Sequence, residues 1–333
     1  MRKTTGVKIK GIGRCVPELI ATNEDYAKIV DTSDEWITQR TGIKTRHISN
    51  GEPNFFLGAK AAREALAEAG ISADELGLII CATCTPDYYT PSEACLIQRE
   101  LGATGFPCMD INCACSGFVY GVDMARRYLA CDDIKYVLVV ATEELSKFVD
   151  YEDRSTCILF GDAAAAVVLE KQDDTLFSSF TAADGSGAPF LAARALHTIN
   201  PFRSEENTFD MRMPEPHKHY LLQEGKEVYK FATNALPLAV SKACEKAEIS
   251  PAELDAVIPH QANVRIIETA AKKLGVSMDK MVLNIKDYGN TSSASIPNAF
   301  YDGVRSGRIK RGDKVCFVGF GGGLTYGAVV LEY

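Results

Sequence analysis

The sequence predicts a layered α/β fold built from two similar halves. Apolar runs bounded by glycine and proline alternate with longer amphipathic stretches, which is the pattern of strand–helix units. The chain also resembles itself, because AGISADELGLII at 69–80 aligns with AEISPAELDAVI at 247–258. In the same order, GDAAAAVVLE at 161–170 matches LTYGAVVLE at 324–332. Two ordered matches indicate an internal duplication, so we expect a pseudo-twofold arrangement whose site draws residues from both halves.

The expected elements follow this alternation along the chain. Strands are expected at 7–15, 76–84, 108–114, 136–141 and 164–169, and then at 255–258, 282–284, 314–318 and 328–331. Helices are expected at 54–69, 92–101, 116–131, 227–247 and 263–274. The segment 184–219 is rich in glycine, proline and charge and has no clear period, so it is expected to be an irregular loop or cap. The halves are expected to be 1–175 and 176–333.

The composition is that of an ordinary globular protein. Of its 333 residues, 46% are hydrophobic and 24% charged, and the formal net charge of −8 argues against general nucleic-acid binding. The 11 cysteines are scattered through apolar segments, where free cysteine packs as a small hydrophobe. The sequence has no apolar leader or membrane-length apolar stretch, so we expect a cytosolic protein with reduced thiols and no membrane contact.

A candidate nucleophile lies where an apolar strand meets a helix. In INCACSGFVYGVD at 111–123, Cys115 precedes a run with one apolar helical face. Free backbone N–H groups and the positive end of a helix dipole would lower the pKa of a thiol there. Taken alone, the segment is better explained by a small buried residue at a tight turn. Cys113, still inside the expected strand, is expected to be a packing residue.

Two further polar residues occupy positions typical of reactive side chains. His260, in IPHQANVRI at 258–266, follows the tip of an apolar strand and precedes a helix, where α/β folds place reactive groups. Asn290 lies in a Gly-Asn-Thr-Ser turn within NIKDYGNTSSASIP at 284–297. A structural histidine and a turn-forming asparagine are the plainer explanations of each residue alone.

A glycine-rich segment, VGFGGGLTYG at 318–327, supplies bare backbone N–H groups after an apolar strand. It fits an oxyanion hole or a phosphate-cradling loop, but a strand follows it, so it does not fit a dinucleotide-binding motif. Together, a nucleophilic thiol, a histidine, a carboxamide and a backbone oxyanion site are the groups that acyl transfer through a thioester requires.

These segments carry a resemblance to a known family. The chain resembles β-ketoacyl-acyl carrier protein synthase III, a condensing enzyme with the thiolase fold, almost from end to end. The most specific block is DTSDEWITQRTGIKTRHI at 31–48, followed by CACSGF, PHQAN, YGNTS and FGGG. The resemblance implies two duplicated βαβαβαββ halves in a five-layered αβαβα architecture. It also implies decarboxylative Claisen condensation of an acyl-CoA primer with malonyl-acyl carrier protein, giving 3-oxoacyl-acyl carrier protein and initiating fatty acid synthesis.

The resemblance also implies roles for individual residues. The catalytic triad would be Cys115, His260 and Asn290, and the amides of Cys115 and Gly322 would form the oxyanion hole. Positions that hold coenzyme A in the family are matched by Thr32, Trp36, Arg40 and Arg154. Positions that dock the acidic carrier protein are matched by Lys230, Arg265, Lys272 and Lys273. No metal or other cofactor is implied, since coenzyme A is part of the substrate, and a homodimer is expected.

Departures from the family pattern leave the primer open. Thr90 stands where many relatives carry a bulky aromatic that shapes the primer pocket, often across the dimer. A smaller residue would leave space for a branched or longer primer than acetyl, unless Tyr88 and Tyr89 refill it. Ser155 replaces a glycine common beside Arg154. A synthase III-like enzyme that loads an unusual starter in specialised, polyketide-type metabolism is therefore an alternative.

Other readings fit the residues less well. A thiolase would need a second catalytic cysteine in the C-terminal glycine-rich motif, and the elongating condensing enzymes use a second histidine where this chain has Asn290. CATC at 81–84 has the spacing of a zinc or redox site, but the sequence contains no second CxxC to complete one. Cys81 and Cys84 are therefore expected to be packing residues. A non-catalytic binding module remains an alternative if the thiol is inert.

Overall fold

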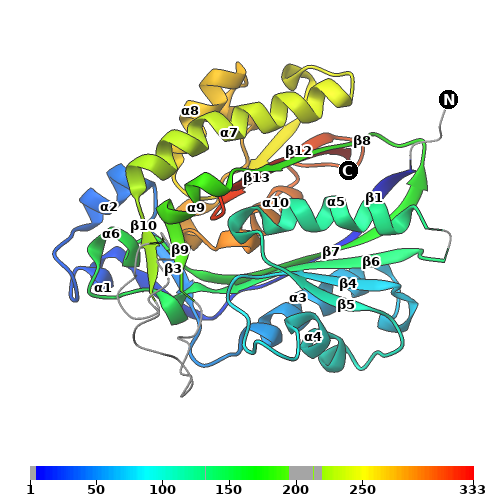
Figure 1. Ribbon diagram of the computed structural model, residues 1–333, viewed down its shortest axis with the longest axis horizontal. Coiled ribbons are helices and arrows are strands. Elements are labelled where there is room, and N and C mark those ends of the chain that lie inside the picture. Colours follow the sequence, from blue (N-terminus) through cyan, green and yellow to red (C-terminus); the bar gives the residue numbers. More distant parts are fainter. Residues whose placement is uncertain (1–4, 132, 195–212, 214–219) are drawn as a thin grey trace, which may run out of the picture.

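The computed structural model describes residues 5–131, 133–194, 213 and 220–333, and its elements form five layers (Figure 1). Two mixed sheets, with strand orders β1-β7-β6-β4-β5 and β11-β12-β13-β8, lie on either side of a central pair of helices. Further helices cover the outer face of each sheet. The thiolase-like αβαβα architecture expected from the sequence is therefore confirmed.

The strands of the first sheet are β1 (Thr5–Cys15), β4 (Leu78–Ala82), β5 (Cys108–Ile111), β6 (Tyr136–Glu144) and β7 (Asp162–Asp173). Those of the second are β8 (Phe177–Ala183), β11 (Ala256–Pro259), β12 (Lys314–Gly321) and β13 (Thr325–Glu332). Two small ribbons pair β2 (Leu19–Thr22) with β3 (Thr45–Ile48), and β9 (Leu191–Ala193) with β10 (Leu221–Gln223).

The two sheets are connected in the same way. In each, the first strand pairs antiparallel with the last, the last pairs antiparallel with the one before it, and that strand pairs parallel with an earlier one. The repeated sequence segments lie on corresponding elements, since 69–80 leads into β4 and 247–258 into β11. The duplication therefore extends from sequence to topology, while the division of the chain at residue 175 stays a prediction.

The helices complete the layers. The central pair is α5 (Gly117–Leu129) and α10 (Ser295–Arg305), the outer helices on the first sheet are α3 (Asn54–Ala69) and α4 (Glu93–Leu101), and those on the second are α7 (Gly225–Lys246) and α8 (Val264–Leu274). The short helices are α1 (Asn23–Tyr26), α2 (Asp34–Thr41), α6 (Arg154–Cys157) and α9 (Ile285–Tyr288). None of the described helices is long and apolar enough to cross a membrane.

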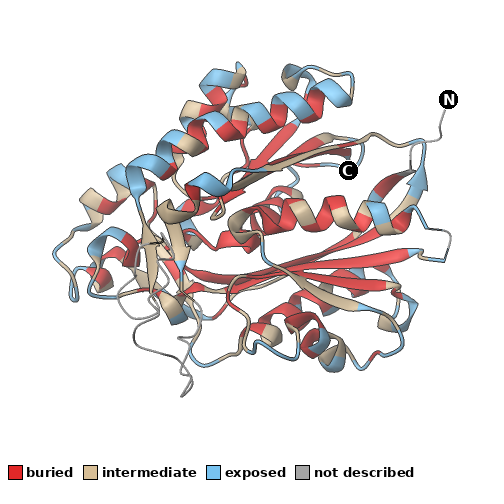
Figure 2. Cartoon of the chain, viewed as in Figure 1, coloured by how far each residue is buried: buried red, intermediate tan, exposed pale blue. Residues whose placement is uncertain are grey.

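The core lies between the sheets and along their inner strands (Figure 2). Phe317 of β12 is fully buried, and its ring meets Phe118 of α5 at 5.3 Å and Phe300 of α10 at 5.0 Å, both edge to face. Aromatic pairs in this geometry add to the free energy gained by burial alone. The central layer thus joins the two halves into one packed unit and fixes the loops at the ends of its helices.

Three expected segments differ from the structure. β5 ends at Ile111, because the Asn112 side chain accepts a hydrogen bond from the Ala114 amide at 3.2 Å and turns the chain. Cys113 therefore lies beyond the strand that was expected to contain it. The expected strand at 282–284 is absent, and only a single bridge joins Met281 to Val257. In the segment 184–219, expected to be irregular, Gly185–Phe190 forms a 3₁₀ helix and Leu191–Ala193 forms β9, while most of the rest lies outside the described residues.

Candidate active site

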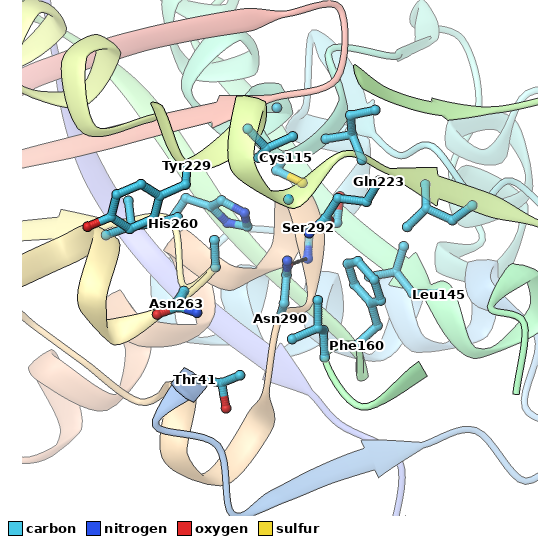
Figure 3. A pocket seen from close by; sticks show the side chains of 18 of the residues that line it. Thr41, Cys115, Leu145, Phe160, Gln223, Tyr229, His260, Asn263, Asn290 and Ser292 are labelled. Atoms are coloured by element: carbon cyan, nitrogen blue, oxygen red, sulfur yellow. Dashed lines mark hydrogen bonds between the residues drawn. The ribbon is translucent and has the colours of Figure 1, made fainter. Parts of the chain in front are cut away.

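A cavity of about 350 Å³ lies where the two halves meet, and residues from both halves line it. Cys115, His260 and Asn290 all line this cavity. Figure 3 shows the sulfur of Cys115 pointing toward the space between the imidazole of His260 and the Asn290–Ser292 turn. The structure thus brings together the three residues that the sequence singled out from segments far apart in the chain.

The backbone at Cys115 is held by a tight turn. Ala114 has a φ of 45°, a left-handed conformation that non-glycine residues adopt only when their surroundings enforce it. The hydroxyl groups of Ser116 and Thr325 hydrogen-bond to each other at 2.8 Å, and Thr325 Oγ1 is 2.9 Å from the Cys113 carbonyl oxygen. These hydrogen bonds hold the turn that carries Cys115, in the first half, against the strand that follows the glycine loop of the second half.

The glycine loop packs directly against the Cys115 backbone. A Cβ on Gly321 would lie 2.5 Å from the Cys115 amide nitrogen, so only glycine fits there. Gly322 is the next residue, and a Cβ on it would lie 3.6 Å from the Ala114 side chain. This contact supports an oxyanion hole shared by the two backbones, although the role expected for the Gly322 amide stays a prediction.

The electrostatics at the thiol differ from the sequence expectation. Burial raises the pKa of Cys115 to about 12, the hydrogen bond from Ser292 lowers it, and the nearby Glu143 carboxylate raises it further. The expected lowering of the pKa by a helix dipole was wrong, because desolvation outweighs it. In addition, Cys115 lies in a 3₁₀ turn (Ala114–Ser116), and the α-helix begins only at Gly117.

His260 is held as a neutral imidazole. Burial lowers its pKa to about 3, and the side chain is almost completely shielded from solvent. The His260 amide donates to the Val318 carbonyl at 2.8 Å, which fixes the residue to β12. Its Nδ1 is 2.7 Å from the Ser295 hydroxyl oxygen, and the ring meets Phe320 edge to face at 5.2 Å. Because Nδ1 is occupied, Nε2 is the nitrogen left for a ligand in the cavity.

Asn290 is fixed through both its backbone and its side chain. Its backbone amide donates to the Leu159 carbonyl at 2.9 Å, and its backbone carbonyl accepts from the Gly161 amide at 3.1 Å. These two hydrogen bonds hold the Asn290 turn against the first half. The side-chain Oδ1 accepts from the Ser292 amide at 2.9 Å, drawn as a dashed line in Figure 3. Since the oxygen is occupied, the side-chain NH₂ is the part available to donate.

Two of the four residues expected to hold coenzyme A, Trp36 and Arg40 of α2, line one side of the cavity. The guanidinium groups of Arg40 and Arg154 lie 4.8 Å and 5.0 Å from the centre of the Trp36 ring. Stacked guanidinium groups on an indole suit a flat base and its phosphates. The hydroxyl of Thr32 is buried with no hydrogen-bond partner among the described residues. Ser155 also lines the cavity.

The sequence did not reveal the apolar wall of the cavity. This wall is formed by Leu145, Phe148, Ile158, Leu159, Phe160, Leu191 and Leu221. Such residues carry no sequence signal, because a wall for an acyl chain has the same composition as an ordinary core. Cys84, which was expected only to pack, also lines the cavity. Thr90 is exposed and is not part of the lining within one chain, so its effect on the primer stays a prediction.

The basic residues expected to dock a carrier protein lie on the outer helices of the second half. Arg265, Lys272 and Lys273 of α8 are exposed, as is Lys230 of α7. Arg265 also lines the cavity, which connects this basic surface with its mouth. Within the residues that the structure describes, no cluster of three His, Cys, Asp or Glu side chains has the geometry of a metal site.

Comparisons with known proteins agree with this geometry. Residues 109–185 match the family model for 3-oxoacyl-[acyl-carrier-protein (ACP)] synthase III, and residues 244–333 match the model for its C-terminal part. The chain is 47% identical to the β-ketoacyl-[acyl-carrier-protein] synthase III of Clostridium novyi, over 98% of this chain and 99% of that one.

Solved structures give the same result. The crystal structure of 3-oxoacyl-[acyl-carrier-protein] synthase III from Aquifex aeolicus superposes with a TM-score of 0.89 at 44% identity, covering 98% of this chain and 100% of that one. A priming β-ketosynthase of a polyketide biosynthetic pathway superposes with a TM-score of 0.87 at 32% identity, covering 100% of this chain and 98% of that one. The chain therefore belongs to the β-ketoacyl-acyl carrier protein synthase III family of thiolase-fold condensing enzymes and is an acyltransferase.

Proposed function

We propose that this enzyme condenses an acyl-CoA primer with malonyl-acyl carrier protein and releases CO₂, using Cys115, His260 and Asn290. The observation that carries the proposal is the convergence of a thiol, a neutral imidazole and a carboxamide NH₂ on one cavity. One group forms the covalent intermediate, and the other two donate hydrogen bonds to the second substrate.

The first half-reaction is acyl transfer. The Cys115 sulfur attacks the thioester carbon, and the amides of Cys115 and Gly322 hold the oxyanion that forms. The carbon–sulfur bond to coenzyme A then breaks, and the thiol proton of Cys115 ends on the departing sulfur. The side of the cavity lined by Trp36 holds the nucleotide end of coenzyme A, while the apolar wall receives the acyl chain.

The second half-reaction is decarboxylation and condensation. His260 Nε2–H and the Asn290 NH₂ donate to the thioester carbonyl of the malonyl group, which stabilises the enolate formed as the bond to CO₂ breaks. That carbanion attacks the acyl carbon, the bond from this carbon to the Cys115 sulfur breaks, and the departing thiolate takes one proton from solvent. Loss of CO₂ supplies the carbanion, so neutral donors suffice and neither a metal nor another cofactor takes part.

The same proposal covers the partners. The basic residues of α7 and α8 receive the acidic carrier protein at the cavity mouth. A homodimer in the cytosol is proposed as the working form. Tyr88 and Tyr89, exposed by 57% and 72% in the segment before α4, and the edge position of β5 in the first sheet are two features that a dimer partner would cover.

The test is the intact mass of the protein after incubation with a panel of straight, branched and longer acyl-CoAs. A single acyl adduct on Cys115, absent from Cys115→Ser, is the expected result, and the most rapidly loaded acyl group identifies the primer. An adduct that persists in Cys115→Ser contradicts the assignment of the nucleophile.

A starter-loading role in polyketide-type metabolism is the second candidate. The 32% identity to a priming β-ketosynthase of a polyketide pathway supports this second role. The same panel separates the two roles, because a preference for an unusual starter together with a dedicated carrier protein supports the second, whereas a common primer used with the carrier protein of fatty acid synthesis supports the first.

A further inference from the structure

A buried carboxylate that the proposed chemistry does not use lies beside the active site. Glu143, near the end of β6, is fully buried. Its Oε1 accepts from the Ser293 hydroxyl at 2.7 Å, and its Oε2 accepts from the Thr85 hydroxyl at 2.7 Å and the Cys84 amide at 3.1 Å. The Cys84 thiol donates to Oε2 at 3.4 Å, and the Thr83 hydroxyl does so at 3.3 Å.

These donors come from both sides of the cavity. Cys84 lines it from the first half, in the segment that follows β4. Ser293 belongs to the second half and follows Ser292, whose amide holds the Asn290 side chain. The carboxylate therefore bridges the cavity wall and the Asn290 turn. All the hydrogen-bond donors that reach it from the described residues are neutral, so its burial is compensated by hydrogen bonds.

We propose that Glu143 is a positioning residue for the condensation: it holds the turn that carries Asn290 against the wall of the acyl cavity. This inference rests on the proposed function, because it assigns Glu143 to the half-reaction in which Asn290 acts. A glutamine could not replace it, since its NH₂ group would face hydroxyl and amide donors where the carboxylate offers only acceptor oxygens.

The charge of Glu143 gives a signature that a merely structural residue would lack. The titratable groups on the neighbouring elements that its charge affects are the thiols of Cys81, Cys84 and Cys115, and it raises the pKa of each. Neutralising Glu143 therefore makes Cys115 easier to ionise, although the same change loosens the Asn290 turn. We therefore expect the Cys115 thiol to become more reactive while Asn290 becomes less effective as a hydrogen-bond donor.

The experiment compares three variants of the full-length protein. In Glu143→Gln, alkylation of Cys115 by iodoacetamide at neutral pH, followed by mass spectrometry of its peptide, is expected to be about threefold faster or more, because losing the carboxylate charge lowers the pKa of Cys115 and raises its thiolate fraction. Decarboxylation of malonyl-acyl carrier protein is expected to fall about tenfold or more, from the loss of buried hydrogen bonds. Acylation of Cys115 by acetyl-CoA is expected to fall less.

Two further variants separate the charge from the hydrogen bonds. Ser293→Ala removes the 2.7 Å bond and keeps the carboxylate, so decarboxylation falls while the alkylation rate stays at the wild-type value. Glu144→Gln is the matched control, because this half-buried neighbour pairs with Lys147 at 3.2 Å, and we expect it to change neither rate.

The proposal is overturned if Glu143→Gln lowers both half-reactions by the same factor and leaves the alkylation rate unchanged or lower. Normal decarboxylation by Ser293→Ala overturns it as well, even if Glu143→Gln does not fold. If the wild-type protein neither accepts an acyl group nor decarboxylates, the proposed function fails instead. The alkylation comparison then still reports whether the carboxylate acts on Cys115.

Discussion

At the scale of single residues, the protonation state of Cys115 sets how it reacts. With its pKa raised to about 12 by burial, the side chain is a thiol over the whole physiological range. Below its pKa the thiolate fraction grows tenfold with each pH unit. Alkylation of Cys115 by iodoacetamide, measured on its own peptide, should therefore accelerate continuously between about pH 6 and pH 9. A plateau below about pH 8 would show instead a thiol whose pKa is lowered.

The two hydrogen-bond donors are expected to act in only one half-reaction. His260→Ala or Asn290→Ala removes a donor to the malonyl thioester and leaves the Cys115 turn in place. Decarboxylation of malonyl-acyl carrier protein should fall about a hundredfold or more, the usual loss when one oxyanion donor is removed. Acylation of Cys115, followed by intact mass, should change far less. If acylation falls as much as decarboxylation, His260 also activates the thiol, as a general base would.

The three residues proposed to be catalytic could be singled out in the sequence because each lies at a junction, but only their joint presence and the family resemblance indicated catalysis. Cys115 follows a strand, His260 follows a strand tip, and Asn290 lies in a turn rich in small residues. The direction of the Cys115 pKa shift could not be found this way, because desolvation depends on atoms brought in by distant segments. Cys84 was missed for a similar reason, since its contact with Glu143 exists only in the folded chain.

At the scale of elements, the joint between the halves depends on the central aromatic cluster. Phe317→Ala on β12 removes the ring that meets both central helices, and we expect the free energy of unfolding to fall by about 3–5 kcal/mol. Chemical denaturation checks this. Phe56→Ala on α3 is the control, because that side chain is only half-buried and stacks on Lys60 at the outer surface. An equal loss of unfolding free energy in the two variants would contradict a central role for the aromatic cluster around Phe317.

Elements with a full amphipathic period were the most predictable. The helix expected at 54–69 has those bounds in the structure, because its buried face is long and regular. Short strands were harder to place. The ribbon β2–β3 was not expected. The strand expected at 282–284 does not form, and the only ladder contact of this segment among the described residues is the bridge from Met281 to Val257.

At the scale of the whole molecule, the repeat in the sequence predicted two connected sheets, and the structure contains them. The repeat also explains why the site needs both halves. The thiol of Cys115, the proposed nucleophile, comes from the first half, whereas the imidazole of His260, the carboxamide of Asn290 and the glycine loop come from the second. The relation of this chain to a second copy cannot be derived from its internal symmetry, because that depends on the shape of the outer surface.

Charge distribution over the whole molecule yields the last prediction. The chain carries a net charge of −8, so an acidic carrier protein approaches it against a repulsive average field and needs a local basic surface. Lys230→Glu combined with Lys272→Glu reverses two exposed charges on α7 and α8 and leaves Arg265 in place, because Arg265 lines the cavity itself. The KM for malonyl-acyl carrier protein should rise about tenfold at low salt.

Acylation by acyl-CoA should be unchanged in the same protein, because its substrate is bound at the side of the cavity lined by Trp36 rather than along the outer helices. Raising the ionic strength should reduce the difference in KM between variant and wild type, since exposed charges are screened over a Debye length of about 10 Å at 0.1 M salt. Lys310→Glu, an exposed charge in the loop before β12, changes the net charge without touching the basic surface. If it raises log KM by half as much as the double variant does, which is the same effect per reversed charge, the carrier senses only total charge, and docking on α7 and α8 is wrong.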